Sequence, residues 1–150
     1  MTISVIIPAA GSASRAKLNR NKIFFDLGGV TVAEKTVAAF SNIENVTEII
    51  IACAKRDEES LKEIFSGNPL IKLVRGGDTR TDSVKNALKA ASGDITLIHD
   101  CARPFVTHNL IYNIIEAVKA HGAAIPVLPF TDTLGFGNEE YITETKREKL

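Results

Sequence analysis

The chain contains few of the residues that mark specialised protein classes. Its 150 residues include no tryptophan, two cysteines and only 6% aromatic residues. The cysteines, Cys53 and Cys101, are too few and too far apart in sequence to indicate a disulfide framework or a zinc site. The scarcity of aromatic side chains also argues against base-stacking platforms for single-stranded nucleic acid.

Neither sign of charge dominates, and no hydrophobic run is long. Lys plus Arg and Asp plus Glu both number 18, so no global field attracts the chain to nucleic acid or to a membrane surface. No stretch approaches the roughly 20 apolar residues of a membrane span. Charged residues arrive by Arg15 after one short apolar run, so we expect no signal peptide and a cytoplasmic location. Because the charges balance, an anion-binding site must come from cations gathered at one place on the surface.

Short apolar runs alternate with amphipathic helical patterns along the chain. We expect strands at residues 3–7, 48–54, 71–74 and 95–98, and a fifth strand that begins at 123–126. We expect helices at 31–40, 56–65, 81–91 and 107–121, with Thr31 and Thr107 as N-caps. This alternation predicts one α/β domain, a Rossmann-like three-layer sandwich with a mostly parallel sheet.

The segment after the first strand is the most informative. Pro8 ends the strand, because proline cannot donate to a sheet ladder, and the residues from Ala9 to Ser14 are all small. Small side chains let a ligand approach the backbone, and consecutive N–H groups in such a turn can bind an anion. The cations Arg15 and Lys22 follow. This combination suits a triphosphate, although a tight connection between strand and helix would explain the loop alone equally well.

Other nucleotide-binding patterns fit poorly. A dinucleotide fingerprint requires G-x-G-x-x-G, but after Gly11 the later glycine positions hold Ala13 and Ala16. A Walker loop is excluded because no Gly-Lys-Ser/Thr occurs. An oxidoreductase of the Rossmann type would need an acidic residue at the end of the second strand, which ends instead at Ala54-Lys55.

Polar segments also follow the third, fourth and fifth predicted strands, at residues 75–83, 99–104 and 129–133. In open parallel sheets, ligands bind beyond the carboxyl ends of the strands. Each segment alone has a plainer explanation, such as a flexible turn or a helix cap. Together at one edge of the sheet, they predict a shared cleft.

Four segments form an ordered set of motifs: Pro8-Ala9-Ala10-Gly11 with Arg15 and Lys22, Gly76-Gly77-Asp78-Thr79-Arg80 with Asp82-Ser83-Val84, His99-Asp100 with Ala102-Arg103-Pro104-Phe105, and Asp132-Thr133. In this order they resemble the motifs of the 2-C-methyl-D-erythritol 4-phosphate cytidylyltransferase family of the sugar-phosphate nucleotidylyltransferases. The resemblance covers the chain from the first strand to Leu150. It implies transfer of a cytidylyl group from CTP to 2-C-methyl-D-erythritol 4-phosphate, giving CDP-methylerythritol and pyrophosphate in non-mevalonate isoprenoid biosynthesis.

The resemblance also implies roles for individual residues. Catalytic roles fall on Arg15, Lys22 and Arg147. Nucleotide binding falls on residues at the ends of the strands, namely Pro8, Ala9, Ala10, Gly11, Ser12, Gly77, Asp78, Arg80, Ser83, Asp100 and Cys101. Substrate binding falls on Asp100, Arg103, Thr133 and Arg147. The resemblance implies Mg²⁺ bridged mainly by phosphates, with Asp100 as a candidate neighbour.

The end of the chain predicts a dimerisation arm. Residues 132–147 are expected to form a β-hairpin around Gly137-Asn138, and the resemblance implies that this arm embraces a second subunit in a homodimer. A surface hairpin without a partner is the alternative.

The chain departs from the family pattern at Ala13, Ile23 and Cys101, where the family usually has glycine, glutamine and alanine. It also stops before a C-terminal segment of the family. We therefore expect residues 1–150 to be a single nucleotidyltransferase core domain without that segment, with apolar surface near residues 123–126 and the long helix left uncovered. A ribitol-5-phosphate cytidylyltransferase, or a nucleotide-binding fragment without turnover, remains an alternative.

Overall fold

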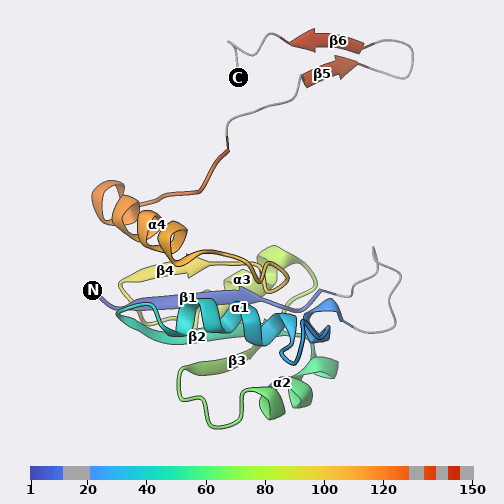
Figure 1. Ribbon diagram of the computed structural model, residues 1–150, viewed down its shortest axis with the longest axis vertical. Coiled ribbons are helices and arrows are strands. Elements are labelled where there is room, and N and C mark those ends of the chain that lie inside the picture. The colour runs from blue at the N-terminus through green and yellow to red at the C-terminus, as the bar shows by residue number, and fades with distance from the viewer. Residues whose placement is uncertain (12–20, 129–133, 138–141, 146–150) are drawn as a thin grey trace.

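A central parallel sheet organises the protein. The computed structural model describes residues 1–11 and 21–128, and the backbone of residues 134–137 and 142–145 (Figure 1). Four strands pair in the order β3-β2-β1-β4. Their bounds are β1 (Ile3–Pro8), β2 (Val46–Cys53), β3 (Ile71–Arg75) and β4 (Ile95–Ile98). All three pairings are parallel, which confirms the first four predicted strands and the α/β class.

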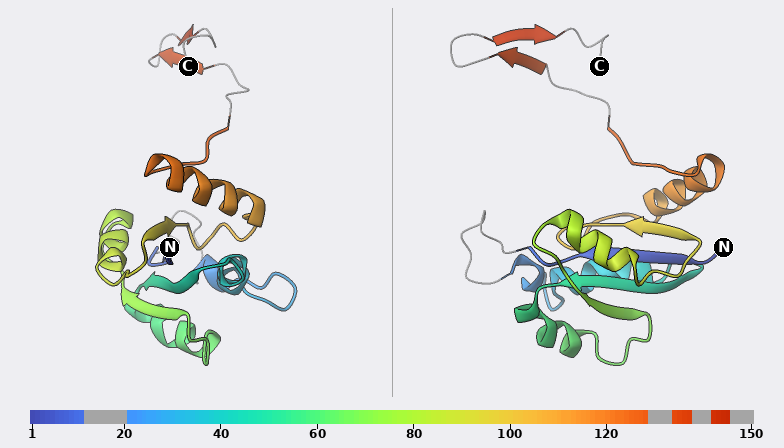
Figure 2. Two further views of the ribbon diagram at one scale, coloured as in Figure 1. Left: turned by 90° about the vertical axis from the view of Figure 1, so that its left-hand side faces the viewer. Right: turned by 180° about the vertical axis from the view of Figure 1, so that it is seen from behind.

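The sheet is buried on both faces because its inner strands are almost entirely apolar. Val5, Ile6 and Ile7 of β1 are fully buried. Successive side chains of a strand point to opposite faces, so Val5 and Ile7 belong to one apolar cluster and Ile6 to another. α1, α2 and α4 contribute to the first cluster and α3 to the second, so the sheet lies between two helical layers (Figure 2).

Local signals in the sequence set the helix boundaries. α1 (Val32–Ser41) begins with a capping box in which Thr31 and Glu34 bond each other's backbone N–H. α4 (His108–His121) is capped by Thr107 and ends at Gly122, whose φ of 82° is the left-handed conformation that glycine adopts readily. α2 (Glu58–Ile64) follows the short turn η3 (Lys55–Asp57), and α3 (Arg80–Leu88) is capped by Thr79. These four helices confirm the predicted ones, although α2 and α3 are shorter than expected.

The predicted fifth strand at residues 123–126 is wrong. This segment forms no strand, and it leads away from the sheet after α4 (Figure 1). A strand needs a neighbour to satisfy its backbone groups, and β4 pairs with β1 alone among the described strands. Ile125, Val127 and Leu128 are 80%, 78% and 90% exposed. The expectation of uncovered apolar surface in this region is thus confirmed.

A hairpin lies apart from the sheet (Figures 1 and 2). Its strands, β5 (Leu134–Gly137) and β6 (Ile142–Thr145), pair antiparallel, with Leu134 opposite Thr145 and Gly137 opposite Ile142. This confirms the predicted hairpin, whereas its contact with a second subunit stays a prediction. In the part of the chain that the structure describes, no helix has the length and apolar character needed to cross a membrane.

Candidate functional site

The loops that follow the four strands begin side by side at the carboxyl edge of the sheet. The backbone N–H of Ala9 donates to Ala52 (2.8 Å), and that of Gly76 donates to Cys53 (2.9 Å). The N–H of His99 donates to Ile6 (2.9 Å). These hydrogen bonds continue the pairing of the strands just beyond their ends, so the structure brings the predicted segments after β1, β3 and β4 to one edge. The predicted segment at residues 129–133 lies outside the described residues.

Gly76 places the loop after β3 directly against the loop after β1. A Cβ atom at residue 76 would lie 2.4 Å from the Cβ of Ala10 and 3.2 Å from the Oγ of Ser83. Only a residue without a side chain allows this approach. The backbone N–H groups of Ala10 and Gly11 donate to no residue that the structure describes, so they are available to an anion at this point.

Ser83 shapes the loop that carries Gly77 and Asp78. Its hydroxyl accepts a hydrogen bond from the N–H of Gly77 (3.0 Å) and donates to the carbonyl of Thr79 (3.0 Å). The side chain is buried, whereas Asp78 is exposed. Ser83 therefore fixes the backbone of Gly77, and Asp78 projects from the edge of the sheet.

Asp100 lies between two arginines. Nη2 and Nε of Arg80 lie 2.8 Å and 2.9 Å from Oδ1 of Asp100, and Nε of Arg103 lies 3.3 Å from Oδ2. Burial alone would raise the pKa of Asp100, but the hydrogen bond from Arg80 and the charges of both arginines outweigh it and lower the pKa. The arginine side chains are 61% and 75% exposed, so their remaining donors face solvent, where they can bind an anion.

Cys101 enters the site by its backbone rather than by its thiol. The side chain is buried, which raises the pKa of Cys101 to about 12. Its N–H lies 3.5 Å from the carbonyl of Pro8, and its carbonyl accepts from the hydroxyl of Thr36 (2.7 Å). Any contact with a nucleotide is therefore expected from the peptide group of Cys101.

Lys22 begins the short helical turn η2 (Lys22–Phe24) and is exposed. Its amine forms no ion pair with any residue in the described ranges. Ile23, which departs from the family pattern, is 2% exposed and belongs to the core. The apolar residue anchors the turn, and the cation beside it faces solvent.

Asn21 and Asp57, which no sequence pattern indicates, interact beneath this turn. Nδ2 of Asn21 donates to the carbonyl of Ala9 (3.2 Å) and to Oδ2 of Asp57 (2.9 Å). Both residues are buried polar groups. They are 36 positions apart in sequence, and no motif connects them, so only the folded chain shows the pair.

Four predicted site residues, Ser12, Arg15, Thr133 and Arg147, lie outside the described residues, as does Ala13. Their roles stay predictions.

The described residues contain no group of three or more His, Cys, Asp or Glu side chains placed to hold a metal ion. A Mg²⁺ ion that keeps water and phosphate ligands needs only one or two carboxylates, so Asp100 fits such an ion and a cage made only of protein ligands does not.

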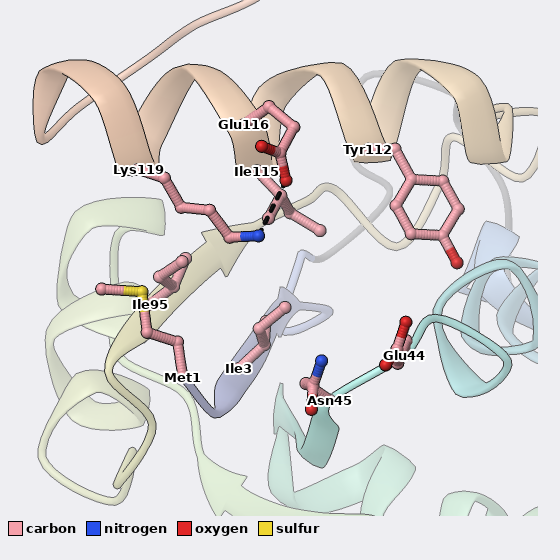
Figure 3. Close-up of a pocket in the computed structure, with 9 residues that line it drawn as sticks. All are labelled: Met1, Ile3, Glu44, Asn45, Ile95, Tyr112, Ile115, Glu116 and Lys119. Carbon is pink, nitrogen blue, oxygen red and sulfur yellow. Dashed lines mark hydrogen bonds and ion pairs between the residues drawn. The ribbon is translucent and has the colours of Figure 1, made fainter.

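A cavity of about 420 Å³ lies at the opposite, amino edge of the sheet, beneath α4 (Figure 3). Its walls carry the carboxylates of Glu44 and Glu116, and its one lysine, Lys119, is already paired with Glu116 at 2.7 Å. Two acidic groups would repel a triphosphate. The carboxyl edge is therefore the better candidate site.

Comparison with known proteins identifies the family of the chain. The family model for 2-C-methyl-D-erythritol 4-phosphate cytidylyltransferase matches residues 3–150. The protein of that name from Halalkalibacterium halodurans is 37% identical over 100% of this chain and 68% of its own length. The one from Thermus thermophilus is 42% identical over 89% of this chain and 58% of its own length.

A solved structure of a protein named for this activity also matches the chain. The crystal structure of 4-diphosphocytidyl-2C-methyl-D-erythritol synthase from Anaerococcus prevotii superposes with a TM-score of 0.82 at 30% identity, over 98% of this chain and 65% of that one. The chain thus spans about two thirds of the length of such relatives. The match over nearly every residue, in sequence and in fold, shows that the chain belongs to the 2-C-methyl-D-erythritol 4-phosphate cytidylyltransferase family.

Proposed function

We propose that the protein transfers a cytidylyl group from CTP to 2-C-methyl-D-erythritol 4-phosphate, as part of isoprenoid biosynthesis. Membership of the family supports this proposal. The observation that carries it is the convergence at one sheet edge of three elements: the available N–H groups of Ala10 and Gly11, the loop of Gly76 and Gly77, and the Asp100 cluster.

The chemistry requires positioning and charge rather than a general base. A phosphate monoester oxygen of the substrate is already ionised at neutral pH, and it attacks the α-phosphorus of CTP. The bond from that phosphorus to the pyrophosphate oxygen breaks, and pyrophosphate leaves. The main obstacles are repulsion between two anions and the charge that accumulates on the α-phosphate, which cations and oriented N–H groups stabilise.

The residues of the carboxyl edge suit these tasks. We propose that the N–H groups of Ala10 and Gly11 bind the phosphates of CTP and that Lys22 stabilises the α-phosphate in the transition state. Gly77 and Asp78 lie on a loop that Ser83 holds in place, and we propose that this loop contacts the cytosine. Arg15 and Arg147 share the cationic role in this proposal.

The cluster around Asp100 suits the second anion. Arg80 and Arg103 are held by Asp100 and keep donors toward solvent, so we propose that Arg103, together with Thr133 and Arg147, binds the phosphate of the polyol. When bound, Mg²⁺ neutralises charge on the triphosphate, and Asp100 is the carboxylate that we propose beside it.

We further propose a homodimer through the β5–β6 hairpin. An isolated two-stranded hairpin is marginally stable in water, and this one lies apart from the sheet (Figure 1). A second subunit would supply the missing contacts. Sedimentation at micromolar concentration tests the dimer.

We also propose a cytoplasmic location, which suits Cys53 and Cys101 because both are unpaired thiols.

The experiment for the main proposal measures pyrophosphate release and the nucleotide product, with CTP and each of two polyol phosphates. We expect CDP-methylerythritol from methylerythritol phosphate, and its loss in Lys22→Ala. Product from ribitol 5-phosphate alone would contradict the proposed substrate. CTP binding without product from either polyol would contradict turnover and indicate a nucleotide-binding protein.

A further inference from the structure

We propose that Asn21 and Asp57 form a positioning pair that holds Lys22 at the carboxyl edge of the sheet. The inference deepens the proposed function and rests on it, because the importance of Lys22 comes from that function. Asn21 is the residue before Lys22, and Asp57 belongs to η3, the turn that follows β2. The pair thus connects the turn of Lys22 to two central strands.

The side-chain amide of Asn21 makes three hydrogen bonds. Nδ2 donates to the carbonyl of Ala9 (3.2 Å) and to Oδ2 of Asp57 (2.9 Å). Oδ1 accepts from the N–H of Ile23 (3.4 Å), which caps the first turn of η2. The three partners belong to the end of β1, the segment after β2 and the turn of Lys22. A single side chain therefore fixes the relative position of all three.

Asp57 determines which way the amide faces. An ionised carboxylate only accepts hydrogen bonds, so it selects the orientation in which Nδ2, rather than Oδ1, points toward Asp57 and Ala9. Asp57 is itself held in place, since its N–H donates to the carbonyl of Ala54 (3.0 Å) and Nε of Arg56 lies 3.8 Å from its Oδ1. Its side chain is 9% exposed. The orientation of the Asn21 amide is therefore set by a buried neighbour that has contacts of its own.

The backbone on either side of Lys22 is anchored in the same way. The N–H of Phe24 donates to the carbonyl of Asn21 (3.1 Å), and the N–H of Phe25 donates to that of Lys22 (3.2 Å). Ile23 and Phe24 are buried. The Lys22 side chain is the exposed member of this turn, so the direction in which it leaves the backbone depends on contacts made by its neighbours.

The Asn21–Ala9 hydrogen bond also joins the two ends of the segment at residues 10–20. The bond spans 12 positions, and bringing the ends of such a segment together costs conformational entropy. Ala9 precedes the N–H donors of Ala10 and Gly11, and Asn21 precedes Lys22. The pair therefore keeps the proposed phosphate donors and the proposed cation in register.

The test compares Asn21→Ala with two further variants. Asn68→Ala is the matched control, because Oδ1 of Asn68 also caps a turn, accepting from the N–H of Leu70 (3.1 Å) before β3 at the amino edge. The other is the double variant Asn21→Asp/Asp57→Asn, called the exchange, in which the two side chains are swapped. A donor and an acceptor then face each other again between residues 21 and 57. An ionised Asp at 21 cannot donate to the Ala9 carbonyl, so the exchange keeps the pair and removes the connection to β1.

We expect Asn21→Ala to lower kcat about 10-fold or more, because small misplacements of a catalytic group are costly, while KM for CTP changes less. The exchanged variant is expected to unfold closer to the wild-type temperature than Asn21→Ala does and to keep the low kcat. Asn68→Ala should leave kcat unchanged. Two results would overturn the positioning role. One is a wild-type kcat in Asn21→Ala, and the other is an exchanged variant whose kcat returns toward the wild-type value together with its unfolding temperature.

A spectroscopic measurement separates this inference from the proposed function. Lysines are methylated reductively with ¹³C, and the Lys22 signal is assigned by its absence in Lys22→Arg. We expect CTP to shift this signal in the wild type and to shift it less in Asn21→Ala. If the wild type made no CDP-methylerythritol, the proposed function would fail, but the ratio of the two shifts would still decide the pair: equal shifts overturn it, and a smaller shift in Asn21→Ala supports it.

Discussion

Arg80 and Asp100 are joined by an ion pair across the carboxyl edge of the sheet, with Nη2 of Arg80 2.8 Å from Oδ1 of Asp100. Arg80 is the first residue of α3, and Asp100 follows β4. α3 packs on one face of the sheet, whereas β4 is the edge strand beside β1, so the pair connects the helical layer to the end of a sheet strand. The carboxylate also meets Arg103 and so aligns two guanidinium groups.

Asp100→Asn should therefore lower activity more than stability. The substitution keeps the size of the side chain but removes the charge that holds both arginines. We expect kcat/KM to fall about 10-fold, because charge-assisted hydrogen bonds to Arg are stronger than neutral ones, and the free energy of unfolding to change by less than about 1 kcal/mol, because both arginines are exposed.

The control for this variant is Glu116→Gln, which weakens the Lys119–Glu116 ion pair on α4 at the amino edge. Steady-state kinetics and urea unfolding are measured for both. Equal losses of kcat/KM in the two variants would contradict a specific role for Asp100.

Gly76→Ala should disrupt nucleotide binding. The new Cβ would lie 2.4 Å from the Cβ of Ala10, so the loops after β1 and β3 must move apart. We expect the Kd for CTP, measured by calorimetry, to rise about 10-fold or more, since the donors at Ala10 and Gly11 lose their alignment.

Gly93→Ala is the matched control for Gly76→Ala. A Cβ at residue 93 would lie 2.5 Å from the backbone nitrogen of Ser4 at the amino edge, so the substitution is sterically comparable but distant from the site. We expect it to lower the melting temperature and to leave the Kd for CTP of the folded protein unchanged. A similar rise of Kd in both variants would show that Gly76 acts only through global stability.

Glu48 should make stability depend on pH. It is a buried residue of β2 that accepts hydrogen bonds from Lys72, Ser4 and Ser92. Burial alone would raise the pKa of Glu48, but these bonds outweigh it and lower the pKa from 4.5 to about 2. Because the folded state holds the carboxylate ionised, its contribution is complete above about pH 4.5 and is lost as the pH falls toward about 2.

Urea unfolding of the wild type and of Glu48→Gln between pH 2 and 7 tests this dependence. We expect a difference in unfolding free energy of about 1–3 kcal/mol at neutral pH, reduced by solvent screening because the Lys72 side chain is 54% exposed. The difference should shrink as the pH falls. Glu63→Gln, at an exposed position, serves as the control, and a gap between wild type and Glu48→Gln that stays constant with pH would contradict the assignment.

The backbone amides of residues 123–128, except Pro126, which has no N–H, should exchange rapidly with solvent. The N–H of Gly122 still donates to the carbonyl of Val118, but no N–H of residues 123–128 donates to a backbone group in the part of the chain that the structure describes. Amides without such bonds open at little free-energy cost, whereas those of β1 lie inside the sheet. Hydrogen exchange measured by NMR should show strong protection for Val5 to Ile7 and almost none for residues 123–128. Strong protection of this segment would indicate a strand partner and restore the predicted fifth strand.

Much of the fold could be predicted because local signals agree with the tertiary structure. The β-branched run of β1 is buried on both faces, and Thr31 and Thr107 cap the helices that they were expected to cap. The fifth strand was predicted wrongly from an apolar run alone, because sequence cannot show whether a strand has a neighbour. The apolar residues near Ile125 are exposed for that reason.

The candidate site could be predicted in part. Its position at the carboxyl edge follows from the topology, and the structure pairs Asp100 with Arg80 and Arg103 at this edge, whereas their roles in binding stay predictions. The burial of Cys101 could not be inferred, because it depends on residues distant in sequence, such as Thr36, whose hydroxyl donates to the Cys101 carbonyl. The pair of Asn21 and Asp57 was missed for the same reason.

A titration of the ¹⁵N-labelled protein with CTP and Mg²⁺, followed by NMR, tests most directly whether CTP binds at the carboxyl edge of the sheet. We predict saturable shifts of the amides of Ala10, Gly11, Gly76 and Gly77, with those around Tyr112 and Lys119 at the amino edge unchanged. Saturable shifts confined to the amino-edge cavity, or no shifts at millimolar CTP, would contradict the account.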